Sequence, residues 1–354
     1  MGNSLIGKLA QWGWALEATT VGLELEPTAG IPNFNKASIE YGQEWIEETK
    51  ATGVTVPHTF EVTKGALNPS WTPEMSLTIP LFGQLMCHLC HNCVESGAGP
   101  YLQTIIPPIA NGKEVTYGAT RTGNQVYSST VKQKLTQTAP RDIAGLGGII
   151  NRIDVTIPEF GYVKVTPHFL FFDLITGDTA AGSYTLPLSS TEKLASDFSY
   201  KIGNTPAVLY SKEVQFSMIA DVIVKRYGGV GATTDPGILP SRFVYNGWSL
   251  EGSISKPVVA ATNLVAKDYL ISGGGVGSDQ LMYIYSRTCA DYNSVLANLE
   301  CRFTFNIKVD SATLGYDDET VENIAFKGVY DATNNIFMYQ QATTATQAAW
   351  ATQS

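Results

Sequence analysis

The chain has 354 residues, 44% of them hydrophobic and only 16% charged, and a formal net charge of −9 at pH 7. This length suits two domains, and the hydrophobic fraction is sufficient to give each a core. The negative charge argues against a nucleic-acid-binding protein, because such proteins attract phosphates with Lys and Arg. The low charged fraction favours a protein that buries surface against other subunits.

No segment predicts a transmembrane helix, since the most apolar run, residues 77–89, is too short and is interrupted by Pro80, Gln84 and His88. The N-terminal residues predict neither a signal peptide nor a myristoylation site. The five cysteines are odd in number, and three of them fall within residues 87–93, which does not fit a disulfide framework. We therefore expect assembly in a reducing cytoplasm.

In chain order, the first part of the sequence predicts strands interrupted by two helices. Residues 12–16 alternate as an extended segment does, and residues 38–50 predict a short helix with Ser38 as its N-cap. A strand at 54–62, a turn at 65–71 and a strand at 75–79 follow. The clearest helix covers residues 81–96, where Phe82, Leu85, Met86, Leu89 and Cys93 recur at helical spacing and Gly97 predicts the end. Strands are predicted again at 101–106 and 126–135.

The clearest β-hairpin spans residues 149–172 and predicts the fold class. Apolar and polar residues alternate with a period of two in both arms, so one face is core and the other is a wettable wall of mixed charge. The hairpin loop places Val155 opposite Val165, Asp154 opposite Thr166, and Ile149 opposite Phe171. Burial of one face selects this register, because a slip of one residue would turn every side chain over.

The second half again predicts strands. Residues 181–204, within the Gly-, Ser-, Thr- and Asp-rich stretch 173–207, are predicted as a linker with a short helix near 191–198. Strands are then expected at 214–225, 243–253, 269–271, 301–310, 323–330 and 336–340. The last residues are of low complexity, which indicates a mobile tail.

Three passages carry a resemblance to a known family: PEMSLTIPLFGQLMCHLCHN at 73–92, GGIINRIDVTIPEFGYVKV at 147–165, and CRFTFNIKVDSATLGYDDETVENIAFKGVYDATNN at 301–335. They resemble the major tail tube proteins of long-tailed, siphovirus-like bacteriophages. The resemblance implies a mainly β chain with two tandem β-sandwich or barrel-like domains, 1–180 and 205–354, each with a flanking helix, although the helix is clear only in the first half.

The resemblance also implies a function, which is to form the tail tube through which the genome is delivered. Copies of the chain would form trimeric or hexameric rings that stack into a hollow tube. The implied partners are further copies of the chain, the tape-measure protein, the tail terminator and the baseplate or hub proteins. DNA would pass without specific binding, no cofactor, membrane or enzyme activity is expected, and the protein would be assembled in the host cytoplasm and end in the virion tail.

Two sets of site residues follow from this interpretation. The polar faces of the late strands are expected to line the lumen, with Arg152, Asp154, Thr156, Lys164, Thr166, Arg302, Thr304, Asn306 and Lys308. The segment 27–62 is expected to make the contact between stacked rings, with Trp45, Glu44 and Glu47 at its centre.

Other classes of function remain as alternatives. Cys87, His88, Cys90, His91 and Cys93 suggest a metal-dependent enzyme or a redox protein. Helical geometry opposes this reading, because at 100° per residue only Cys87 and His91 would share one side. The glycine-rich residues 270–279 lack the Lys-Ser/Thr ending of a phosphate-binding loop, and no nucleophile elbow is present. Another β-rich ring component of a virion or secretion machine is the third reading.

Overall fold

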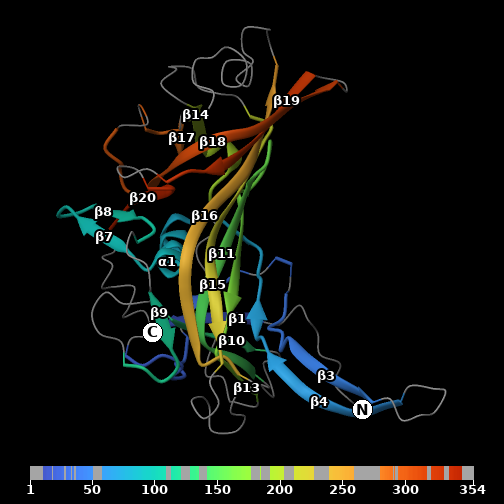
Figure 1. The fold of residues 1–354 in the computed structure, drawn as a ribbon. Coiled ribbons are helices and arrows are strands. Elements are labelled where there is room, and N and C mark those ends of the chain that lie inside the picture. Colours follow the sequence, from blue (N-terminus) through green and yellow to red (C-terminus); the bar gives the residue numbers. More distant parts are fainter. Residues whose placement is uncertain are drawn as a thin grey trace, which may run out of the picture.

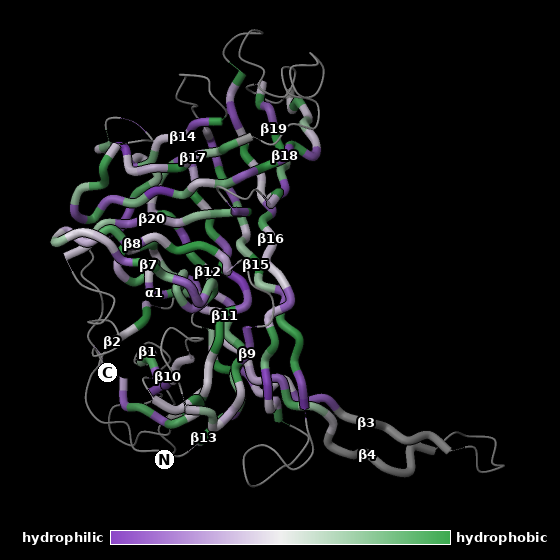
Figure 2. Tube along the Cα trace, turned by 60° about the vertical axis from the view of Figure 1, so that its left-hand side comes forward, coloured by the Kyte–Doolittle hydropathy of each residue, from purple (hydrophilic) through white to green (hydrophobic). Residues whose placement is uncertain are grey.

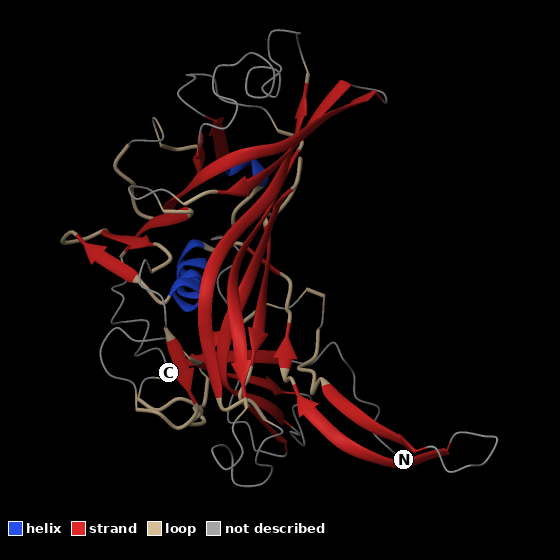
Figure 3. Ribbon diagram, viewed as in Figure 1, coloured by secondary structure: helices blue, strands red, loops and turns tan. Residues whose placement is uncertain are grey.

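The computed structural model describes residues 11–17, 19–27, 29–32, 34–35, 37–50, 58–108, 113–120, 128–134, 142–176, 184, 192–202, 211–226, 239–258, 280–289, 291, 294–316, 320–330 and 335–344. Over these residues the chain is mainly β, as the sequence predicts, its strands pair antiparallel, and it has one α-helix (Figures 1 and 3).

The elements of the first half, up to residue 176, are β1 Gln11–Leu16, β2 Ala29–Gly30, β3 Gln43–Lys50, β4 His58–Leu67, β5 Ser70–Trp71, β6 Met75–Ser76, α1 Ile79–Cys90, β7 Cys93–Ser96, β8 Tyr101–Ile105, β9 Glu114–Thr116, β10 Ser129–Lys134, β11 Asp142–Ile157, β12 Lys164–Leu170 and β13 Asp173–Thr176. Those of the second half are the 3-10 helix η3 Ala195–Asp197, β14 Phe198–Ile202, β15 Glu213–Lys225, β16 Arg242–Pro257, β17 Gln280–Ser286, β18 Glu300–Tyr316, β19 Thr320–Gly328 and β20 Phe337–Thr343.

Two sets of strands form the body of the molecule. The long sheet runs in the order β12, β11, β15, β16, β19 and the second half of β18. The short sheet runs β14, β17, the first half of β18, β20, β8 and β7. Strand β18 belongs to both, and the short sheet crosses the upper part of the long one (Figure 1).

The core lies between these sheets and around α1. Phe216 of β15 contacts Phe303 and Phe305 of β18, with ring centroids 5.4 and 4.9 Å apart. From the helix, Phe82 contacts Phe303 at 5.5 Å and Tyr339 of β20 at 5.0 Å, both edge to face. Such aromatic pairs stabilise the core beyond the burial of their area, and they set the position of the two sheets and α1 relative to one another.

Strands from the two predicted domains are neighbours in this body. β11 pairs with β15, β9 with β16, and β8 with β20, so the ladders cross from residues 1–180 to residues 205–354 in three places. One core cluster takes side chains from Trp12 through Tyr339. The predicted linker, 181–204, contributes β14 and η3 to the structure, and the short helix expected near 191–198 is reduced to the three residues of η3. The two halves therefore share their sheet and their core.

The hairpin register is confirmed near its turn and shifts further away. Val155 pairs with Val165 and Asp154 with Thr166, as predicted. A β-bulge between Ile150 and Arg152 adds one residue to β11, so Ile149 faces Leu170 and not Phe171.

The predicted helix at 38–50 is wrong, because residues 43–50 form β3 and pair with β4. The apolar side of the predicted helix is weak in the sequence, and the backbone of residues 43–50 instead pairs with β4, with Ile46 opposite Thr63. β3 and β4 form a two-stranded sheet of their own, which projects from the body as an arm (Figure 2). We call this hairpin, residues 43–67, the arm.

The helix α1 begins and ends earlier than predicted. Pro80 lies in its first turn, where a missing N–H costs nothing. His91 adopts a left-handed conformation with φ of 51° and donates its N–H to Cys87 O, which ends the helix. Cys93 therefore lies not on the helix but in β7, opposite Ile105.

A buried carboxylate fixes the N-terminal strand to the body. Glu17 follows β1 and is only 1% exposed. Its two oxygens accept hydrogen bonds from the backbone N–H groups of Gly22 (2.7 Å) and Gly147 (2.8 Å) and from the hydroxyls of Ser128 (2.6 Å) and Thr130 (3.0 Å). Burial raises the pKa of Glu17, and these hydrogen bonds oppose the rise.

Candidate functional site

The outward side of the long sheet is a continuous polar surface, which we call the polar face. Along residues 152–157 of β11 and along β12 every second residue is buried in the core, and the residues between them are half-buried or exposed. The same alternation continues through residues 213–220 of β15 and 250–256 of β16, so the pleat turns one kind of side chain outward over this part of the sheet. The charged and polar members of the polar face are Lys164, Thr166, His168, Arg152, Asp154, Thr156, Glu213, Gln215, Ser217, Glu251, Ser253, Ser255, Asn323, Lys327, Lys308 and Asp310.

The strand register sets these side chains in rows across the sheet. One row consists of Thr166, Asp154, Ser217, Glu251, Lys327 and Lys308, each directly opposite the next. At about 4.8 Å between strands, this row of six residues is about 24 Å long. Acidic, neutral and basic groups therefore alternate within a short distance.

Asp154 is the centre of a hydrogen-bond network on this face. One of its oxygens accepts from Arg152 Nε at 2.6 Å and from Ser217 Oγ at 2.5 Å, and the other lies 2.8 Å from His168 Nε2. Arg152 also donates to Ser217 Oγ at 3.1 Å. Partial burial tends to raise the pKa of Asp154, but the hydrogen bonds of His168, Ser217 and Arg152 prevail and lower it to about 2.

This network does not have the arrangement of a hydrolytic site. A serine nucleophile needs a base within hydrogen-bond reach, with a third group behind the base. Here the carboxylate of Asp154 lies between the serine and the histidine, so Ser217 donates to Asp154 and not to His168. The network instead neutralises Arg152 and holds three neighbouring strands together.

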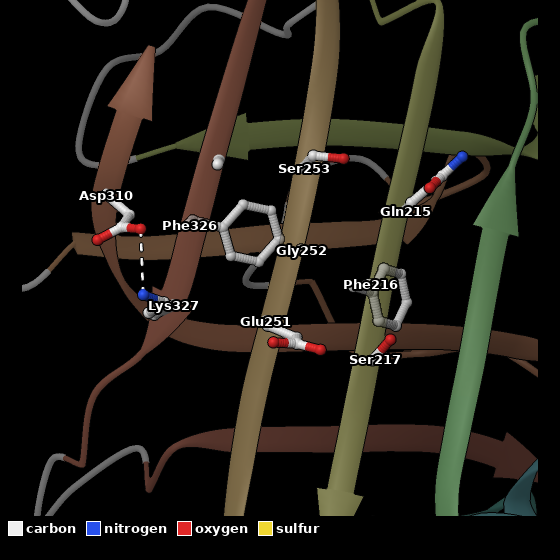
Figure 4. A pocket seen from close by; sticks show the side chains of 10 residues that line it. Gln215, Phe216, Ser217, Glu251, Gly252, Ser253, Asp310, Phe326 and Lys327 are labelled. Atoms are coloured by element: carbon white, nitrogen blue, oxygen red, sulfur yellow. Dashed lines mark ion pairs between the residues drawn. The ribbon is translucent and has the colours of Figure 1, made fainter.

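A shallow groove of about 320 Å³ crosses β15, β16, β19 and β18 on the polar face (Figure 4). Ser217, Ser253 and Ala325 line it with small side chains. Glu251 and Lys327 also line it, and Lys327 Nζ lies 3.1 Å from Asp310 in an exposed ion pair. The groove is therefore polar and open, unlike the largely apolar and enclosed pockets of small-molecule enzymes.

The structure separates the residues predicted to line a lumen into two groups. Arg152, Asp154, Thr156, Lys164, Thr166 and Lys308 lie on the polar face and are half-buried or exposed. Arg302 is half-buried and donates to Gln340. Thr304 and Asn306 are each only 2% exposed, so their prediction is wrong. That part of β18 runs between β17 and β20, and Asn306 uses its side chain to bind Val329 O at 3.0 Å.

Of the residues predicted to stack rings, Glu44 is exposed at the base of the arm and accepts a hydrogen bond from Asn68 Nδ2 at 3.2 Å. Trp45 and Glu47 lie in β3, but their side chains are outside the described residues. The glycine-rich segment 270–279 and the strand predicted at 269–271 also lie outside them.

The cysteine segment packs inside the body. Cys87, Cys90 and Cys93 are buried thiols, and burial raises the pKa values of Cys87 and Cys90 far above the ordinary value. His88 and His91 are buried against Trp14 and Tyr245, with ring centroids 5.3 and 4.4 Å apart. Within the described part of the chain, no three His, Cys, Asp or Glu side chains come together as metal ligands.

Sequence reasoning missed the members of the polar face on β15, β16 and β19. The signal was present, because Glu213, Gln215 and Ser217 alternate with buried Val214 and Phe216 as clearly as the first hairpin does. What the sequence does not reveal is the pairing of β11 with β15, which are separated by the 55 residues 158–212. The face became one surface only when that pairing was known.

None of the described helices has the length and apolar character needed to cross a bilayer. No family model matches the chain, and no curated protein matches it.

Proposed function

We propose that this chain is a structural subunit that assembles with copies of itself into the tube of a phage tail, with the polar face as the wall of the channel. The observation that carries the proposal is the polar face itself, six antiparallel strands wide, backed by a packed core and balanced in charge. A channel for DNA needs a wet wall that is not strongly cationic, because each phosphate contact would add affinity and slow passage. The resemblance in residues 73–92, 147–165 and 301–335 supports the same function.

The arm supports a role in assembly. An isolated two-stranded hairpin is marginally stable in water at best, so a partner that covers it would stabilise it. We propose that the arm contacts the next ring, with Trp45, Glu44 and Glu47 in that contact. Its ends meet where Asn68 N donates to Gly42 O at 3.2 Å.

The first test of this proposal is the state of the purified protein. Size-exclusion chromatography and negative-stain microscopy are expected to show rings or tubes. A protein that stays monomeric at high concentration, under conditions that favour assembly, would contradict the proposal.

The second test places a cysteine on the polar face. All five native cysteines are buried, so labelling by a bulky thiol reagent reports the new position. Thr156→Cys should react in free subunits and be protected in assembled tubes. Val295, which is 95% exposed and lies off the polar face, gives the matched control Val295→Cys for reagent activity in free subunits. Rapid labelling of Thr156→Cys along intact tubes would place the polar face outside.

The third test removes the arm. Replacing residues 43–67 by a short Gly-Ser turn joins two ends that already lie together, so the body should fold and stay soluble. We expect this variant to form no stacked tubes. Normal tubes from the variant would show that the arm does not make the contact between rings.

A further inference from the structure

The polar face carries four Lys or Arg side chains, and three of them are paired with carboxylates. Arg152 Nε donates to Asp154 at 2.6 Å, Lys164 Nζ lies 3.2 Å from Glu74, and Lys327 Nζ lies 3.1 Å from Asp310. Lys308 is the fourth, and among the described residues it has no ion pair. Three of these four cations are thus neutralised by a neighbouring carboxylate.

The carboxylate of Asp154 does more than pair with one cation. It also accepts from Ser217 and lies beside His168, so several hydrogen bonds hold it in place. The only other described hydrogen bond of Arg152 goes to the Ser217 hydroxyl, which carries no charge. Loss of the charge on Asp154 would therefore leave Arg152 on the face as an unneutralised cation.

The second pair lies in the same area of the sheet. Lys327 is directly opposite Lys308 on β18, and Glu251 is directly opposite Lys327 on β16. Asp310 is the extra residue of the β-bulge between Val309 and Ser311, and its carboxylate lies 3.1 Å from Lys327 Nζ. The row from Thr166 to Lys308, about 24 Å, matches about seven base pairs of duplex at 3.4 Å each. Cations freed along it would face several phosphates at once.

We infer that the polar face is a latent binding surface for the phosphates of double-stranded DNA, kept inactive by the carboxylates of Asp154, Glu74 and Asp310. This inference rests on the proposed function, in which DNA passes along this face. A wall of acidic side chains alone would repel DNA, and free Lys and Arg would hold it. A wall whose cations are paired with carboxylates would neither repel DNA nor hold it.

The test uses the double variant Asp154→Asn/Asp310→Asn, which frees Arg152 and Lys327. Binding of a fluorescent duplex of about 30 base pairs is measured by anisotropy between 50 and 200 mM NaCl. Each new phosphate contact should steepen the slope of log K against log salt by about 0.9, so the expected change is about 1.8. At 50 mM salt this corresponds to about tenfold tighter binding for each released cation.

The matched control is Glu40→Gln/Glu159→Gln, which changes the net charge by the same amount at two exposed positions off the polar face. The single variant Asp310→Asn is a second control, because both side chains of its ion pair are more than half exposed and the substitution should leave the fold intact. It should give about half the change in slope. Binding by the double variant equal to that of the control would overturn the inference.

The outcome also separates this inference from the proposed function. Tubes seen by microscopy without a gain in DNA affinity would refute the latent binding surface and still support the proposed tube. A gain in affinity by a protein that forms neither rings nor tubes would support the binding surface and refute the proposed tube.

Discussion

The Asp154 network predicts a pH-dependent contribution to stability. The pKa of Asp154 is about 2 in the folded protein, against 3.8 for the free side chain. Because the folded pKa is depressed, the contribution is fully present above 3.8 and is lost as the pH falls from 3.8 to 2. A difference of about 1.8 units corresponds to about 2.4 kcal/mol, and the half-exposed position of the pair reduces this to about 1 to 2 kcal/mol.

The perturbation is Asp154→Asn, which keeps the shape and removes the charge. Urea unfolding should show a loss of about 1 to 2 kcal/mol at pH 7, and about half that loss at pH 3. Asp310→Asn is the control, because its exposed pair should contribute less than about 0.5 kcal/mol at either pH. An equal loss for Asp154→Asn at both pH values would refute the reasoning, since it would show that packing and not charge is responsible.

Three further predictions concern the interior. Glu17→Gln should cost about 2 kcal/mol in urea unfolding, because in either orientation its NH2 group would face a backbone N–H, that of Gly22 or of the buried Gly147; an unchanged stability would contradict this. Gly83→Ala, which usually stabilises a helix, should destabilise the protein by about 1 to 3 kcal/mol, because its methyl group would overlap the Gln341 amide, which Gln103 and Tyr339 hold in place. The half-buried Gln84→Ala is its control and should be neutral or slightly stabilising. Elemental analysis of the purified protein should find no stoichiometric zinc or iron, because burial raises the pKa values of the Cys87 and Cys90 thiols and keeps both protonated; bound metal whose removal unfolds the protein would refute this.

The sequence was sufficient for the elements whose pattern is complete in itself. The hairpin of β11 and β12 needs only local alternation, and its register near the turn follows from keeping Val155 and Val165 on one side. The first strand of the arm, β3, has no such complete local pattern. Residues 43–50 have no strong period of either kind, and the cross-strand partners in β4 decide their conformation.

The lumen prediction failed at Thr304 and Asn306 because alternation reports the two faces of a strand and not what lies against each face. In β11 the polar side meets solvent, and Arg152, Asp154 and Thr156 remain half-buried. In β18 the same pattern runs through residues 301–307, but both sides of residues 303–307 are covered. Beyond Ile307 the strand leaves β17 and β20 and pairs with β19, and Lys308 is the first exposed side chain. One strand thus belongs to a closed layer and then to an open one, and long-range pairing sets the change.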